Sequence, residues 1–180
     1  MGVITPFRYM NGFQFQILGC GGPLKPEVVQ STALGYGYQA ANVFILGEKD
    51  EYWGENRYNF WLAESRKTTG QGFTIKVDTC ERNIAGFQIK NKGQGASAGI
   101  ATKDFRVSGS RTENGPWETL WEDQMIDTKD TSGIPPILLN FTFKDPVTIK
   151  YIKFDMISYW GPYGGGLQFF AAIPATSRHI

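Results

Sequence analysis

Residues 72–110 read GFTIKVDTCERNIAGFQIKNKGQGASAGIATKDFRVSGS, and this stretch indicates the fold class. Its apolar side chains gather in three short runs, which are Phe73, Ile75 and Val77; Ile84, Phe87 and Ile89; and Phe105 and Val107. Polar residues at 78–83 separate the first two runs, and a glycine-rich loop at 91–99 follows the second. Alternating runs of this length with turn residues between them predict antiparallel strands that each bury one face.

The same alternation continues toward the C-terminus. A run from Ile137 to Phe143 predicts a strand, and Asp145-Pro146 after it predicts a turn. Residues 147–156 read as the next strand, whose apolar phase slips after Ile149, so we expect a bulge near Tyr151. Residues 167–173 read as a closing strand. The sequence therefore predicts an all-β, antiparallel sandwich.

Length and composition limit the organisation and the partners. The chain has 180 residues, of which 41% are hydrophobic and 19% charged, as expected of one folded domain. We expect an amino-terminal arm at 1–26 that packs on a sandwich spanning 27–180. The net charge is +1 without a basic run, which argues against nucleic acid as a partner. The sequence contains no run of eighteen apolar residues, so it predicts no membrane-spanning helix.

Several segments resemble the discoidin domain, the coagulation factor V/VIII type C module. They are GFTIKV at 72–77, CERNIAGFQIKN at 80–91, TKDFRVSGS at 102–110, YQAANVF at 38–44, FWLA at 60–63 and GLQFF at 166–170. Their order and spacing cover residues 27–173, and each motif by itself is degenerate. The resemblance implies a single galactose-binding-like jelly roll that binds its ligand through loops at one end. Residues 45–59 form a longer excursion than the family usually has at that place.

Catalytic residue types are scarce in this chain. The single histidine, His179, is next to last, where chains usually fray. Neither a serine nor a cysteine therefore has a histidine base within an ordered fold. Loop carboxylates such as Glu51 could serve a glycosidase, but carboxylates on loops are more often solvated. We expect a protein that is not an enzyme, with a glycan-active enzyme as the lesser alternative.

Aromatic residues are common in the predicted loops. Sugars stack their C–H faces on such rings, while amide and cationic side chains take the hydroxyl groups. The predicted ligand-binding residues are Tyr52, Trp53, Tyr58, Asn91, Lys92, Gln94, Trp160 and Tyr163. The alternative is that these rings merely cover the ends of the core.

The sequence leaves two further features undecided, a calcium site and a disulfide bond. Glu48, Asp50 and Glu51 could supply oxygen ligands to a calcium ion, the one cofactor we consider, or could be solvated. Family relatives complete such a site with a carboxylate on the last strand, where this chain has Gln168. Cys20 and Cys80 are candidates for a disulfide, and two free thiols are the alternative.

Taken together, these features predict a non-catalytic module for carbohydrate recognition or cell adhesion, with a glycan or glycoprotein as partner. A protein-interaction scaffold without a sugar site is the main alternative. A phospholipid-binding module is less favoured, because Glu48, Asp50, Glu51 and Glu55 would repel an anionic bilayer. The resemblance implies an extracellular or cell-surface location, although residues 1–17 lack the pattern of a secretory signal. An intracellular location stays open.

Overall fold

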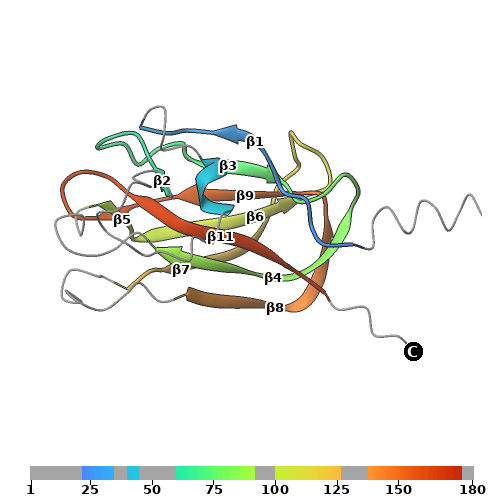
Figure 1. Cartoon of the computed structure of the whole chain (residues 1–180). Helices are drawn as coiled ribbons and strands as arrows, with labels where there is room; N and C mark the ends of the chain where they lie inside the picture. The colour runs from blue at the N-terminus through green and yellow to red at the C-terminus, as the bar shows by residue number, and fades with distance from the viewer. Residues whose placement is uncertain (1–21, 35–39, 45–59, 92–99, 127–137, 176–180) are drawn as a thin grey trace, which may run out of the picture.

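The computed structural model describes residues 22–34, 40–44, 60–91, 100–126 and 138–175, which form an antiparallel β-sandwich (Figure 1). The five-stranded sheet has the order β1 (Glu27–Ser31), β3 (Gln71–Lys76), β9 (Tyr151–Met156), β6 (Asp104–Ser110) and β7 (Glu118–Gln124). The four-stranded sheet has the order β2 (Trp61–Leu62), β11 (Gly166–Pro174), β4 (Arg82–Asn91) and β8 (Leu138–Ile149). A ribbon of β5 (Ala101–Thr102) and β10 (Tyr159–Trp160) and the 3-10 turn η1 (Ala40–Phe44) complete the described elements. The predicted all-β class is confirmed.

The core between the sheets is built from aromatic rings that alternate along the strands. Phe73 and Phe154 stack with their ring centroids 5.2 Å apart, and Trp61 meets Phe73 edge-on at 5.6 Å. From the four-stranded sheet, Phe87 stacks on Phe170 at 5.8 Å. Trp61 is fully buried, and its indole N–H donates to the carbonyl of Thr32. This packing holds both sheets rigidly against each other.

Two details of the predicted strands were wrong. The predicted turn at Asp145-Pro146 is a bulge within one strand: β8 continues through both residues to Ile149, and its register with β4 shifts between Thr142 and Val147. Since β8 is the edge strand of its sheet, it tolerates a proline that cannot donate a hydrogen bond. The predicted bulge near Tyr151 is instead a crossing between sheets: β8 pairs with β4, whereas β9 pairs with β3 and β6. The phase of the apolar residues slips because the buried side of the strand changes with the sheet.

The strand ends define two different ends of the sandwich. At one end β4, β7 and β9 finish and β3, β6, β8 and β11 begin, and the β5–β10 ribbon lies there. We call it the β5 end; it is at the left of Figure 1. The turns from β3 to β4 and from β6 to β7 lie at the opposite end. No helix in the described ranges is long and apolar enough to cross a membrane.

Candidate functional site

The β5 end is where the predicted ligand-binding segments leave the described structure. The segment 92–99 follows Asn91 at the end of β4, and Ile100 leads from it into β5. The segment 45–59 follows η1 and precedes Phe60, next to β2. Tyr52, Trp53, Tyr58, Lys92 and Gln94 lie outside the described residues, so their contact with a ligand stays a prediction.

A buried amide clamp fixes the framework of this end. The Asn91 side chain donates through Nδ2 to the carbonyl of Thr102 at 2.8 Å, and the Thr102 N–H donates to Asn91 Oδ1 at 3.0 Å. The Thr102 hydroxyl donates in turn to the carbonyl of Gly166 at 3.1 Å. Asn91 is 6% exposed and Thr102 is fully buried. The clamp therefore ties β4, β5 and β11 together, and the Asn91 amide is committed to that structural contact.

The loop after β10 presents Tyr163 on a fixed backbone. The Tyr163 carbonyl accepts from the Ser65 hydroxyl at 3.2 Å and from the Arg66 N–H at 3.3 Å. The carbonyl of Gly165 accepts from the Ala63 N–H at 2.9 Å. A Cβ at Gly166 would lie 2.5 Å from the carbonyl oxygen of Trp61, so this close approach needs glycine. Tyr163 is thus 59% exposed on a well-anchored loop.

Trp160 is oriented by its neighbours. Its indole N–H donates to the carbonyl of Met125 at 3.1 Å, and the Lys103 ammonium lies 4.7 Å from the centre of its ring. The Lys103 backbone is held on both sides, because its N–H donates to Ser158 and its carbonyl accepts from Met125. The indole N–H of Trp160 is thus already used, while part of the ring remains accessible.

The exposed apolar side chains are gathered at this same end. The large hydrophobic side chains that the described part of the chain exposes are Leu34 (47%), Ile126 (69%), Ile157 (44%) and Tyr163. Ile126 follows the end of β7, Ile157 follows β9, and Leu34 is hydrogen-bonded through its N–H to the carbonyl of Leu62 in β2. All four therefore lie at the β5 end, with Leu34 and Ile126 beyond the opposite edge strands β1 and β7 of the five-stranded sheet. Exposed apolar side chains at one end of a β-sandwich favour that end as a contact surface.

One carboxylate at the β5 end already accepts hydrogen bonds from neighbouring side chains. Asp104 accepts from the Ser158 hydroxyl and from the Gln124 amide at 2.9 Å. These two hydrogen bonds, with a smaller effect from the charge of Lys103, lower the pKa of Asp104 although burial opposes them. The Asp104 carboxylate is therefore ionised at neutral pH and directed at its own neighbours.

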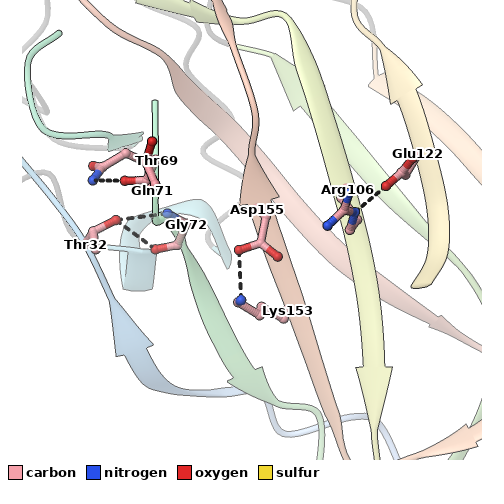
Figure 2. Close-up of polar contacts among 8 residues, drawn as sticks. All are labelled: Thr32, Thr69, Gln71, Gly72, Arg106, Glu122, Lys153 and Asp155. Atoms are coloured by element: carbon pink, nitrogen blue, oxygen red, sulfur yellow. Dashed lines mark hydrogen bonds and ion pairs between the residues drawn. The ribbon is translucent and has the colours of Figure 1, made fainter. Parts of the chain in front are cut away.

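The outer face of the five-stranded sheet is polar and self-paired (Figure 2). The Lys153 ammonium lies 3.0 Å from the carboxylate of Asp155, and Arg106 pairs with Glu122 on the next strand. Near the start of β3, the Thr32 hydroxyl donates to the carbonyl of Gly72 and accepts from its N–H at 2.9 Å. With its charges already paired, this face is less suited to a ligand than the β5 end.

The opposite end is also stabilised by internal polar contacts. Asp78 is buried and accepts from the Thr79 N–H at 2.7 Å and from the guanidinium of Arg82, which also donates to the Gly22 carbonyl at 2.8 Å. Burial raises the pKa of Asp78, but the hydrogen bonds from Thr79 and Arg82 outweigh it and lower the pKa. Cys80 lies in the same turn; Cys20 is outside the described residues, so the bond between them stays a prediction.

An apolar recess of about 240 Å³ lies between β3 and β11, away from the β5 end. Leu24, Pro26, Ile75, Val77 and residues 169–172 line it. A recess with this lining has no polar side chain that could orient a sugar.

The predicted calcium ligands Glu48, Asp50 and Glu51 also lie outside the described residues. Within the described ranges, no group of three His, Cys, Asp or Glu side chains is arranged to hold a metal ion. The calcium site therefore stays a prediction.

Sequence reasoning missed Lys103, Ile126, Ile157 and Arg66, which the fold brings to the β5 end. Lys103 was read as part of a family motif and not as a site residue. Its contact with Trp160 joins residues 57 positions apart and depends on the pairing of β5 with β10. The one local signal in the sequence is the apolar pair Met125-Ile126, which stands directly before a polar stretch and could have indicated an exposed apolar residue.

Comparisons with known proteins address the fold. No protein-family model and no curated protein sequence matches the chain. Solved structures do match. A CBM32 module of a family 31 glycoside hydrolase from Clostridium perfringens superposes with a TM-score of 0.57 at 12% identity, covering 86% of this chain and 96% of that one. This chain has the fold of the family 32 carbohydrate-binding modules.

Two further modules support the same fold. The family 32 module of NanJ from C. perfringens, in complex with galactose, gives a TM-score of 0.56 at 12% identity and covers 83% of this chain and 92% of its own. The CBM32 of AlyQ, in complex with 4,5-unsaturated mannuronic acid, gives 0.55 at 12% identity and covers 86% and 97%. These modules share the galactose-binding-like jelly roll with discoidin domains, so the predicted jelly roll is confirmed, while the finer discoidin assignment stays a prediction.

Proposed function

We propose that this chain is a non-catalytic module that recognises a carbohydrate through its β5 end. The observation that carries the proposal is that the exposed large apolar side chains of the described residues, Leu34, Ile126, Ile157 and Tyr163, all lie at that end. Binding of sugars by family 32 modules of the same fold, one with galactose and one with an unsaturated mannuronic acid, supports it. A glycan or glycoprotein is then the partner, in an extracellular or cell-surface setting.

Tyr163 is the centre of the proposed contact. Its ring is exposed while its backbone is fixed by Ser65 and Arg66, so little conformational freedom is lost on binding. Trp160 is partly exposed and its ring contacts Lys103, so it is proposed to extend this surface toward Lys103. Trp53 and Gln94 are proposed to complete the site, because the chain leaves the described residues toward both of their segments near this end.

A glycan array tests the proposal. It is probed at physiological calcium and again with a chelator, which also tests the proposed calcium site at Glu48, Asp50 and Glu51. Covering about 60 Å² of the Tyr163 ring would contribute about 1.5 kcal/mol, so Tyr163→Ala should weaken binding of the array hits about tenfold. Trp117→Ala is the matched control, since Trp117 is a half-exposed aromatic residue at the opposite end.

One observation favours a second candidate, a protein-binding surface. Ile126 and Ile157 are aliphatic, and aliphatic side chains suit a protein contact better than the stacking of a sugar ring. An array without hits would overturn the carbohydrate proposal. Binding to an isolated protein partner that is lost with Ile126→Asp would then support the second function.

A further inference from the structure

The contact between Lys103 and Trp160 places a positive charge inside the apolar surface of the β5 end. The Lys103 ammonium lies 4.7 Å from the centre of the indole ring, within the range of a cation–π interaction. The Trp160 ring is itself oriented by its hydrogen bond to Met125, and the Lys103 backbone is hydrogen-bonded to Ser158 and Met125. The ammonium is therefore held in position before any ligand arrives.

This ammonium forms no ion pair with a carboxylate of the described residues. Lys103 makes no ion pair within the described ranges, whereas Lys67, Lys76, Arg82, Arg106, Arg111 and Lys153 each pair with an acidic residue. The adjacent Asp104 carboxylate is directed at Ser158 and Gln124 instead. The charge of Lys103 helps to lower the pKa of Asp104, but the two groups are too far apart to form an ion pair. An ammonium that lies on a ring and forms no ion pair with a described residue can receive an anionic group.

A second cation lies at the same end. Arg66 is exposed, and its N–H donates to the Tyr163 carbonyl, so the residue lies directly beside the proposed sugar contact. Its φ of 61° is unusual for a residue other than glycine and fixes it at the tip of the turn from Glu64 to Lys67. Like Lys103, it forms no ion pair with a described carboxylate.

We propose that the β5 end prefers acidic saccharides, and that the Lys103 ammonium pairs with an anionic group, a carboxylate or a sulfate, on a sugar held by Tyr163. The inference rests on the proposed carbohydrate function and names its substrate class. Arg66 would add to the same preference from the Tyr163 side. The contact with the Trp160 ring restrains the Lys103 side chain, so little side-chain freedom would be lost when the ammonium binds an anion.

The test compares neutral and acidic probes that are matched in backbone: fully methyl-esterified against free oligogalacturonides, and unsulfated against sulfated galactan oligosaccharides. Isothermal titration calorimetry at two salt concentrations should give tighter binding of at least one acidic probe, with an affinity that falls as salt rises. Lys103→Met keeps the aliphatic cover of the indole and removes the charge. It should lower the affinity for the acidic probe about fivefold and leave the affinity for the neutral probe unchanged.

Three controls keep the outcome interpretable. Lys144→Met removes an exposed lysine away from the β5 end and should change no affinity. Lys103→Arg should retain the preference, because it retains the charge. Arg66→Met should lower only the acidic affinity.

Two results would overturn the inference while the proposed function stands: neutral probes bind as tightly as acidic ones, or Lys103→Met weakens neutral and acidic probes alike. If no saccharide of any kind binds, the proposed function itself fails. The preferred acidic probe distinguishes carboxylate from sulfate as the recognised group.

Discussion

Replacing Asn91 with alanine separates a structural role of this residue from a ligand contact. The change removes both hydrogen bonds of the clamp, at 2.8 and 3.0 Å, and leaves the fully buried N–H and carbonyl of Thr102 without this partner. An unsatisfied buried polar group costs about 1 to 3 kcal/mol, and water entering the space of the lost amide recovers part of it. We expect Asn91→Ala to lower the free energy of unfolding by about 3 kcal/mol.

Urea unfolding followed by tryptophan fluorescence measures this loss, and calorimetry should show a melting temperature about 6 to 12 °C lower. Gln88→Ala is the matched control: Gln88 lies on the same strand and its amide donates to Asn140 at 2.7 Å, but water can reach that contact. We expect a loss of only about 0.5 kcal/mol there. If Asn91→Ala leaves the melting temperature unchanged and abolishes glycan binding, Asn91 is a ligand contact and the clamp is unimportant for stability.

Two more predictions concern the turn between β3 and β4. Arg82→Met should destabilise the fold by about 3 kcal/mol at pH 7, because it leaves Asp78 charged and buried without its partner. Since the fold lowers the pKa of Asp78, the stability from this group is present above about pH 4 and is lost as the pH falls through the lowered value. The difference between wild type and Arg82→Met in urea unfolding should therefore narrow below pH 4, and a constant difference would contradict this account. Separately, peptide mass mapping without reductant should yield a Cys20–Cys80 linked peptide; two alkylated thiols would refute that prediction.

Most of the scaffold was predictable from the sequence because side-chain alternation reports directly on burial. Phe73, Ile75, Phe105 and Val107 alternate with polar residues, and the structure buries all four. Alternation does not report which sheet a strand joins. β3 and β4 follow each other in the chain yet lie in different sheets. At Lys150 the chain passes from β8 in one sheet to β9 in the other, and this passage shifts the apolar alternation in the same way as a bulge within one strand would.

The candidate site was predictable only in part. The rings of Trp160 and Tyr163 stood out as aromatic residues in a glycine-rich loop, and both lie at the β5 end. Asn91 was proposed as a ligand contact, but an asparagine that pairs with a buried backbone looks the same in sequence as one that faces a sugar. The roles of Lys103 and Ile157 depend on contacts between distant strands, which no local pattern reveals.

The central claim is that the β5 end is the ligand-binding surface, and a nuclear magnetic resonance titration tests it most directly. The amide spectrum of ¹⁵N-labelled protein is recorded while an oligosaccharide identified on the array is added. We predict that the shifted amides cluster at Arg66, Lys103, Ile157 and Tyr163. A cluster of shifted amides around Arg106 and Lys153 on the outer sheet face, or in the turn around Asp78, would contradict the claim.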